Sequence, residues 1–175
     1  MGFGAIALFG SFFITLWLTE PPTPGIALTS GQFDHGVQLI PGGKIIQRFK
    51  PDHRSIQMIS LSVVTFAKTP TPYTIDWKAT AVSKDSRVEI GKGKIYTQDI
   101  KDWQILKLVT PVTPKFNSDE IVVEFSVPAG QTVTNLAGLV LFRPSAGEKL
   151  IPAEIDGKPS NEGLVVGLQI HYTTS

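Results

Sequence analysis

The chain has 175 residues, with 16 basic side chains, 15 acidic side chains and no cysteine. The lack of cysteine excludes a disulfide framework, a thiolate nucleophile and a zinc–thiolate site, and the interleaved charges form no basic stripe, which argues against nucleic acid as a partner. The 13 prolines and 16 glycines separate short apolar runs, a pattern typical of an all-β domain with many turns.

Residues Gly2–Thr19 carry no charged side chain. As a helix they rise ~27 Å, close to the ~30 Å hydrocarbon core of a bilayer. A cleaved signal peptide is the alternative. However, the segment has no basic n-region and no small-residue cleavage site, and it ends in Glu20-Pro21-Pro22, a helix stop. We therefore expect residues 1–19 to form a retained transmembrane helix.

The charges that flank this helix give its expected orientation. The amino terminus is the one positive charge before it, Glu20 follows it directly, and the first basic side chain is Lys44. This distribution favours a cytoplasmic amino terminus, although no Lys or Arg stands beside the helix to set the orientation. We expect a single-pass membrane protein whose C-terminal domain is extracytoplasmic, on the periplasmic side.

One face of the predicted helix carries small residues. Gly4, Ala7, Ser11 and Thr15 are spaced by three, four and four positions, which places them in one stripe. A stripe of small residues lets another helix approach closely in lipid. The alternative is that such residues are simply common in membrane spans. The stripe predicts a helix-packing interface with other membrane-protein subunits, within the lipid bilayer.

Residues 20–31 are interpreted as a Pro-rich linker, stiff where it is polyproline-like, and residues 32–175 as one β-sandwich domain. In that domain apolar and polar residues alternate with the period of two that strands require. No stretch keeps a 3.6-residue apolar period long enough for a sizeable helix. The nine predicted strands are Val37–Ile40, Lys44–Phe49, Ile56–Phe66, Tyr73–Ala81, Val88–Thr97, Gln104–Val109, Ile121–Val127, Leu136–Phe142 and Leu164–Tyr172.

Three local features are expected within this pattern. The apolar phase slips between Met58 and Ile59, which a β-bulge near Met58 explains. Residues Asp99–Trp103 are expected to form a single helical turn. Residues Gly91–Lys94 lack the spacing of a phosphate-binding loop and are expected to form a turn at a strand edge.

Five features of the domain share a pattern with a known family. They are the G-x-x-x-Q-x-F strand Gly43–Phe49, the strand Ile56–Phe66 after it, Asp102-Trp103 before a later strand, Pro111 at the close of that strand, and a final Gly-rich apolar strand. Over residues 36–172 they resemble the galactose-binding-like jelly rolls found as extracytoplasmic modules of bacterial membrane proteins. The resemblance implies an antiparallel sandwich of eight or nine strands, often involved in carbohydrate binding or protein contact, without shared catalytic residues.

The nucleophiles and bases of the domain form no recognisable catalytic pattern. His35, His53 and His171 show no pair with metal-ligand spacing, and no H-E-x-x-H motif occurs. Serine is plentiful, but there is no G-x-S-x-G elbow. We therefore expect no catalytic residue and no enzyme activity.

Acidic side chains leave one alternative open. Asp99 with Asp102, or Glu154 with Asp156, are close in sequence, but such pairs are more often solvated turn residues than glycosidase carboxylates. Jelly rolls often hold a structural calcium, and Asp99, Asp102 and Asp156 have the oxygen ligands for one, although no EF-hand loop is present. We expect no metal site and no cofactor.

Aromatic side chains are the candidate contact residues. Trp77 alternates in phase with apolar neighbours and is expected in the core. Trp103 stands at a turn before a strand, where its ring is expected to be exposed. Phe33 and Phe116 lie in loop-like contexts and are expected to contact a ligand or a partner.

Two functions fit these observations. The first is a non-catalytic accessory subunit of a larger membrane protein complex, whose helix packs in the membrane and whose sandwich braces partners on the extracytoplasmic face. The second is a membrane-tethered carbohydrate-binding module that works in envelope polysaccharide handling. Co-purified membrane partners favour the first, and glycan binding that depends on Trp103 favours the second.

Overall fold

The computed structural model describes residues 24–27, 32–51, 55–109, 118–146 and 150–172. The expected transmembrane helix, with Gly4, Ala7, Ser11 and Thr15, lies outside these residues, and so does Phe116. Within the described residues, no helix is long and apolar enough to cross a membrane.

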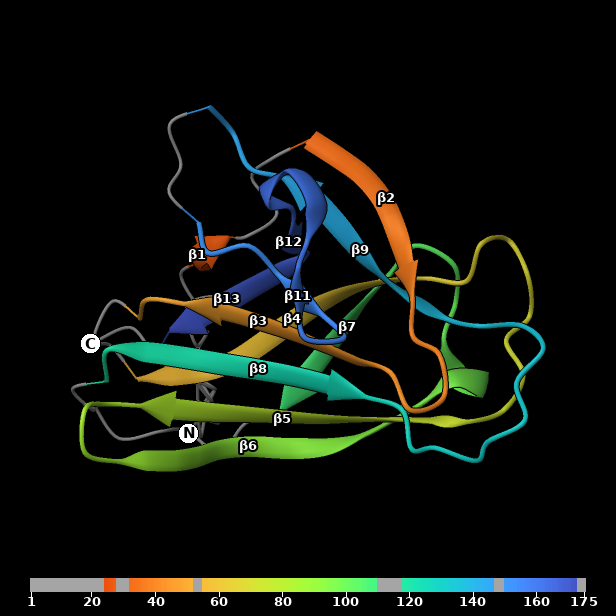
Figure 1. The fold of residues 1–175 in the computed structure, drawn as a ribbon, viewed down its shortest axis with the longest axis horizontal. Helices are drawn as coiled ribbons and strands as arrows, with labels where there is room; N and C mark the ends of the chain where they lie inside the picture. The colour runs from red at the N-terminus through yellow and green to blue at the C-terminus, as the bar shows by residue number, and fades with distance from the viewer. Residues whose placement is uncertain (1–23, 28–31, 52–54, 110–117, 147–149, 173–175) are drawn as a thin grey trace, which may run out of the picture.

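Two antiparallel sheets form the domain (Figure 1). Sheet A contains β1 (Pro24–Ala27), β2 (Gln32–Gln38), β4 (Ile56–Val64), β7 (Gln104–Val109), β9 (Gly138–Arg143), β12 (Val165–Val166) and β13 (Leu168–Tyr172). Sheet B contains β3 (Lys44–Phe49), β5 (Thr74–Val82), β6 (Arg87–Tyr96), β8 (Glu120–Ser126), β10 (Glu154–Ile155) and β11 (Lys158–Pro159). The expected all-β, sandwich-like fold is therefore confirmed.

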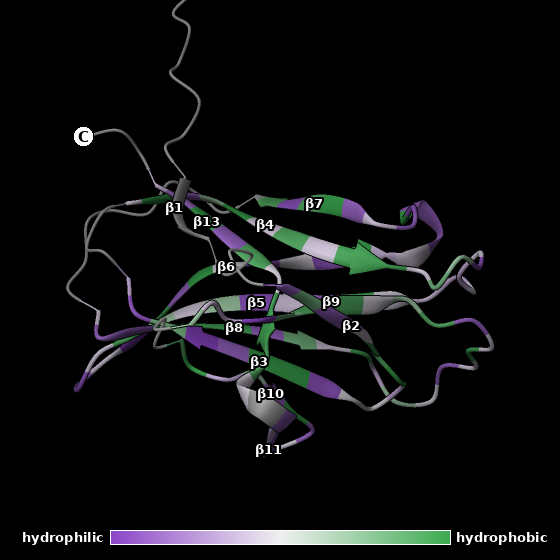
Figure 2. Cartoon of the chain, turned by 90° about the horizontal axis from the view of Figure 1, so that it is seen from above, coloured by the Kyte–Doolittle hydropathy of each residue, from purple (hydrophilic) through white to green (hydrophobic). Residues whose placement is uncertain are grey.

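The first and last described strands, β1 and β13, both lie in sheet A. Its main path is β1-β13-β4-β9-β12, with β7 paired to β4 and β2 paired to β9, whereas sheet B runs β11-β10-β3-β8-β5-β6. Figure 2 shows β1, β13, β4 and β7 toward one side of the molecule and β3, β10 and β11 toward the other. The outer faces of the two sheets therefore point in opposite directions.

The last predicted strand, Leu164–Tyr172, is divided at Gly167. Val166 pairs with β9, and Leu168 pairs with β4. Between them the Gly167 N–H donates to the Val140 carbonyl at 2.8 Å, and the Gly167 carbonyl accepts from the Ser62 N–H at 2.8 Å. A Cβ at this position would lie 2.6 Å from the Phe142 ring, so glycine permits the close crossing.

The period-two pattern predicts the buried face of β8 correctly. In β8, Ile121, Val123 and Phe125 are fully buried and alternate with half-buried residues. Trp77 is buried in the core, as expected. The β-bulge near Met58 is confirmed, because His171 pairs with Met58 while the next residue of β13 pairs with Ile56.

The predicted turn at Gly91–Lys94 is wrong, because these residues lie inside β6 and pair with β5. The glycine there has a packing role rather than a turning role. A Cβ on Gly93 would lie 2.7 Å from Nε1 of Trp77, the residue opposite it on β5. Gly93 therefore leaves room for the buried indole.

Two further local differences concern turns. The helical turn occupies Thr97–Asp99, before the expected Asp99–Trp103. The hairpin of β10 and β11 was not predicted, although it turns at Asp156-Gly157, whose φ angles are 48° and 80°. The Asp156 carboxylate also accepts the Lys44 N–H at 2.7 Å, which holds the hairpin against β3.

Gln47 is a fully buried polar side chain on the interior face of sheet B. Its Nε2 donates to the Ile151 carbonyl at 2.7 Å and to the Arg48 carbonyl at 2.9 Å. Its Oε1 accepts the N–H of Val166, in sheet A, at 2.9 Å. The glutamine of the G-x-x-x-Q-x-F strand thus joins the two sheets through the interior.

We predict that Gln47→Met lowers the free energy of unfolding of the full chain in mild detergent by about 2–4 kcal/mol, because it leaves the Val166 N–H and the Ile151 carbonyl buried without a partner. Urea denaturation measures the loss. Gln169→Met, on the outward phase of β13, is the matched control and should change stability by less than about 1 kcal/mol. Equal losses in both variants would show that the Gln47 bridge contributes nothing specific.

Candidate functional site

The structure brings together two of the predicted contact residues. Phe33, on β2, and Trp103, before β7, form an edge-to-face pair with ring centroids 4.8 Å apart and planes at 72°. Phe33 also meets Phe142 of β9 edge-on, at 6.4 Å. Phe33, Trp103 and Ile105 expose 43%, 59% and 64% of their surface. We call Phe33, Trp103, Ile105 and Phe142 the aromatic patch.

The aromatic patch lies on the outer face of sheet A. Ile105 pairs with Ser62, which alternates with the buried core residues Leu61 and Val63 and therefore faces outward. Phe33 pairs with Phe142 on the neighbouring strands.

A small apolar layer supports the patch. Val64 and Val140 are buried but belong to no part of the cluster between the sheets. Glycine lets the Phe66 ring pack closely on this face, since a Cβ on Gly36 or Gly138 would lie within 3 Å of it. Phe33, Trp103 and Ile105 are therefore the exposed part of this outer apolar layer, and the partly buried Phe142 also packs against the main core.

Asp102 fixes the turn that carries Trp103. Its carboxylate accepts the N–H groups of Thr65 at 2.7 Å and Ala67 at 3.1 Å. Phe66, Ala67 and Trp103 all have left-handed backbone, with φ of 57°, 57° and 56°, a conformation that non-glycine residues keep only when their surroundings impose it. The Thr65 N–H, with the further N–H donors, holds the pKa of Asp102 below its usual value. Trp103 is thus presented by a braced turn.

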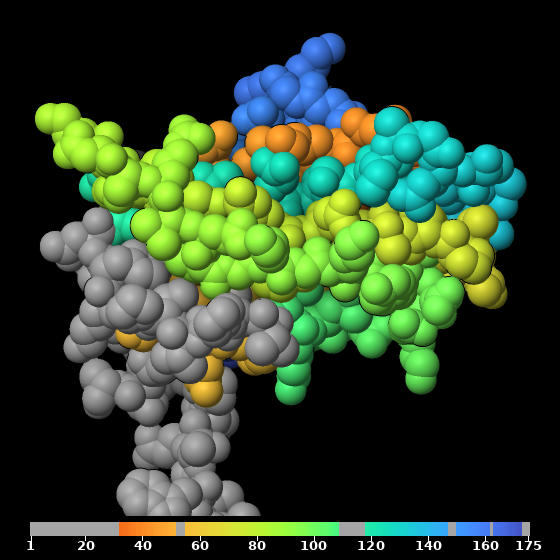
Figure 3. Space-filling model, turned by 90° about the horizontal axis from the view of Figure 1, so that it is seen from below, coloured from red at the N-terminus to blue at the C-terminus, as the bar shows by residue number. Residues whose placement is uncertain are grey.

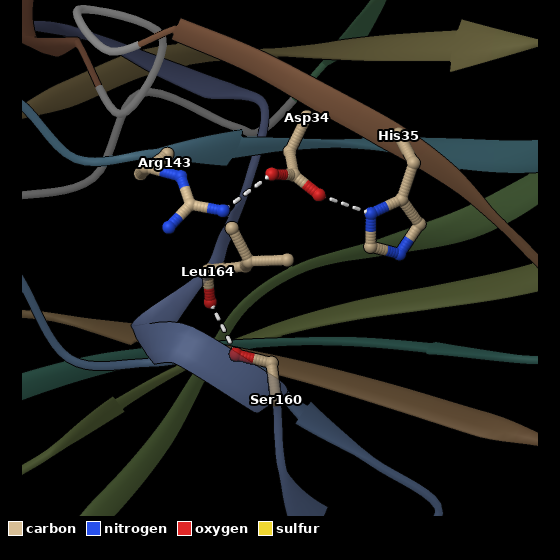
Figure 4. A network of polar contacts seen from close by, with 5 residues as sticks. All are labelled: Asp34, His35, Arg143, Ser160 and Leu164. Carbon is tan, nitrogen blue, oxygen red and sulfur yellow. Dashed lines mark hydrogen bonds and ion pairs between the residues drawn. The ribbon is translucent and has the colours of Figure 1, made fainter.

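Charged residues border the aromatic patch. The Asp34 carboxylate bridges the His35 Nδ1 and the Arg143 guanidinium, which lies 2.8 Å away (Figure 4). Hydrogen bonds from His35 and then from Arg143 lower the pKa of Asp34. On the same face Lys107 alternates with the inward-facing Leu106 and Leu108 and is exposed beside Ile105.

The outer face of sheet B has a different character. Its ion pairs include Lys44–Glu124 at 2.8 Å, Arg48–Glu120 at 3.2 Å and Lys92–Glu89 at 2.9 Å. The face is hollowed by a depression of about 470 Å³ with an apolar floor and a charged rim. Its lining residues are Ile46, Arg48, Lys78, Thr80, Val82, Arg87, Glu89, Val122 and Glu124. Exposed ion pairs of this kind add little stability. Because acidic and basic side chains are paired across it, this face is a polar surface whose charges largely balance.

Ser60 and His171 are the one serine–histidine pair among the described hydrogen bonds. Ser60 Oγ lies 2.8 Å from His171 Nε2, and the buried His171 Nδ1 has no partner in the described part of the chain. A nucleophilic dyad needs a third group that orients the imidazole. The charged group that acts on the imidazole is Lys107, a cation. The geometry therefore gives Ser60 no activated base.

The other sequence candidates take structural roles. Asp102 and Asp156 use their carboxylates to accept backbone N–H groups at separate turns. Among the residues that the structure describes, no three His, Cys, Asp or Glu side chains are grouped as metal ligands would be. Ile105 and Phe142 were not named from the sequence, although Ile105 stands in the outward phase of its strand, which is the signal that marks it.

No protein-family model and no curated protein sequence matches the chain. The jelly-roll resemblance and its implied ligands therefore stay expectations.

We predict that the stability of the domain falls as the pH drops below about 6.5, the ordinary histidine pKa. Burial, and then the charge of Lys107, lower the pKa of His171 in the folded state. The unfolded chain then binds the proton more readily, so stability is present above the unfolded pKa and is lost toward acid. Thermal unfolding between pH 8 and pH 5, run on the full chain in detergent, measures the dependence.

The pH dependence should be shallower in His171→Gln and partly relieved in Lys107→Gln, which removes only the charge contribution. An unchanged dependence in His171→Gln would assign it to other groups.

Proposed function

We propose that this chain is a non-catalytic accessory subunit of a membrane protein assembly. In this proposal the uncharged segment Gly2–Thr19 spans the membrane, its stripe of small residues packs against other subunits, and the sandwich works on the extracytoplasmic side. The observation that carries the proposal is the aromatic patch, an exposed apolar surface on the sheet through which the chain enters the domain.

The entry point keeps the sandwich close to the uncharged segment. β1 is hydrogen-bonded to β13, with Pro24 opposite His171, so the sheet begins inside the range 20–31 that was expected to be linker. Residues 20–23 are all that stands between Thr19 and this strand, and four extended residues reach at most ~14 Å. A domain joined so closely to a membrane span stays at the membrane surface.

The character of the aromatic patch supports a contact function. An aromatic pair and an isoleucine lie exposed side by side, and exposed apolar clusters on soluble domains mark interaction sites more often than isolated residues do. The Asp102 turn holds Trp103 in place before any partner arrives, which lowers the entropy lost on contact.

A membrane-tethered carbohydrate-binding module is the second candidate. The specific observation in its favour is Trp103, which exposes 59% of its surface at a braced turn and has an indole ring suited to stacking on a sugar face. Glycan binding that is lost in Trp103→Ala would support this candidate.

We predict that the full chain, purified in mild detergent, retains a stoichiometric set of membrane proteins identified by mass spectrometry. Gly4→Leu/Ala7→Leu/Ser11→Leu should lose them, because bulky side chains keep helices apart. Phe9→Leu/Phe12→Leu/Phe13→Leu changes the same number of positions elsewhere on the predicted helix and should retain them.

Two outcomes would contradict the accessory-subunit proposal. One is a monomer without membrane partners that binds glycans on an array and loses them in Trp103→Ala. The other is full partner recovery by the Gly4→Leu/Ala7→Leu/Ser11→Leu variant, which would remove the small-residue face as the interface.

A further inference from the structure

We propose that the aromatic patch rests in the lipid–water interface of the membrane that holds the N-terminal segment, with neighbouring lysines directed to anionic headgroups. The inference rests on the proposed function, since it assumes a domain held at a bilayer. It names the partner of the aromatic patch as the bilayer surface.

The composition of the patch fits that environment. Tryptophan is enriched at membrane interfaces, where its apolar ring and polar N–H meet two phases. Trp103 is the largest exposed ring of the patch, and Ile105 beside it exposes 64% of its surface. Burying both side chains to the depth of the acyl boundary would remove apolar surface from water at ~25 cal/mol per Å².

The charge around the patch is asymmetric. β4, β7, β9 and β13, which form most of sheet A, contain no Asp or Glu, whereas Lys107 stands on the outer face next to Ile105. Lys68 and Lys101 are exposed beside the Asp102 turn. On the outer face of sheet B, by contrast, lysines and arginines form ion pairs with five carboxylates. Those carboxylates are Asp76, Glu89, Glu120, Glu124 and Glu154.

No ion pair is found for Lys68, Lys101 or Lys107 among the described residues. An exposed lysine near a membrane surface gains ~1 kcal/mol from anionic lipid. Asp102 remains a charged carboxylate at this turn, but its oxygens accept the Thr65 and Ala67 N–H groups rather than a lysine. Asp34 is paired with Arg143. Lys107 of sheet A, with Lys68 and Lys101 in the adjoining loops, therefore places cations without a described ion pair on the patch side.

The point of chain entry directs this face to the membrane. From Pro24 to Trp103 the sheet spans three strand steps and about six residues, an in-plane distance of ~25 Å. Figure 2 shows β1 and β7 on the same side of the molecule. In Figure 3 the residues of β7 (green) lie on the side opposite the β10–β11 hairpin (blue).

With residues 20–23 as a tether of ~14 Å, sheet A can lie along the interface. Sheet B, with its hollow of about 470 Å³, then faces the aqueous phase. Partners outside the membrane would meet this charged surface, while the aromatic patch sets the orientation of the domain.

The absence of cysteine makes the test direct, because a single introduced cysteine takes one environment-sensitive fluorophore. Ile105→Cys places the probe in the patch. Val88→Cys, on β6 of sheet B and 56% exposed, is the matched control. The labelled full chain is reconstituted in vesicles of phosphatidylcholine, with and without the anionic lipid phosphatidylglycerol. The probe at position 105 should shift to the blue and be quenched by nitroxide-labelled lipid, and the probe at position 88 should show neither effect.

The lysines are tested in the same vesicles. Lys101→Gln/Lys107→Gln should weaken the preference of the position-105 probe for anionic over neutral vesicles by about fivefold for each lysine removed, and Lys92→Gln/Lys94→Gln on sheet B should leave it unchanged.

The results separate the inference from the proposal beneath it. If the probe at position 105 remains as water-exposed as the probe at position 88 in both vesicles, the lipid contact is overturned. If position 105 becomes buried only in native membranes and crosslinks there to protein, the patch binds a subunit, and the accessory-subunit proposal stands without the lipid contact. If the full chain does not float with vesicles at all, membrane attachment itself fails.

Discussion

The side chain of Gln47 connects the two sheets through a largely apolar interior. Its amide holds the backbone of Val166, and the next residue, Gly167, is the point where the last strand crosses from β9 to β4. One buried amide of sheet B is therefore tied to β12, the strand that pairs with β9 of the aromatic patch. A buried polar group of this kind is costly if unsatisfied, and all three of its hydrogen bonds are made within the protein.

The outer faces of the two sheets differ in polarity. Sheet B faces outward with paired charges over a shallow hollow, a surface compatible with water. Sheet A faces outward with a second apolar layer, capped by Phe33 and Trp103. The three residues with left-handed backbone, Trp103 among them, lie at the turns that the Asp102 carboxylate fixes. The exposed apolar surface is therefore carried by a backbone that is fixed by hydrogen bonds. The domain has one face suited to water and one suited to contact.

Much of this follows from sequence patterns. The period of two predicted β3 and β7 to the residue, the bulge at Met58 and the burial of Trp77. Trp103 and Phe33 were chosen as contact residues from expected turn and loop contexts, although Phe33 lies in β2. Their meeting depends on long-range pairing of β2 with β9, which no local pattern encodes. A turn was predicted at Gly93 because glycine occurs both at turns and inside strands where a neighbouring side chain needs space. Only the position of Trp77 in the fold distinguishes these two roles. The bridge of Gln47 to Val166 joins residues 119 positions apart.

The central claim is that the outer face of sheet A lies against the membrane. Hydrogen–deuterium exchange of the unmodified full chain in lipid nanodiscs tests it most directly, because β7 and β6 are both edge strands among the described residues, one in each sheet. The account predicts that amides of β7 exchange more slowly in anionic than in neutral nanodiscs, while those of β6 exchange equally in both. Equal exchange of β7 in the two lipids, matching the behaviour of β6, would contradict it.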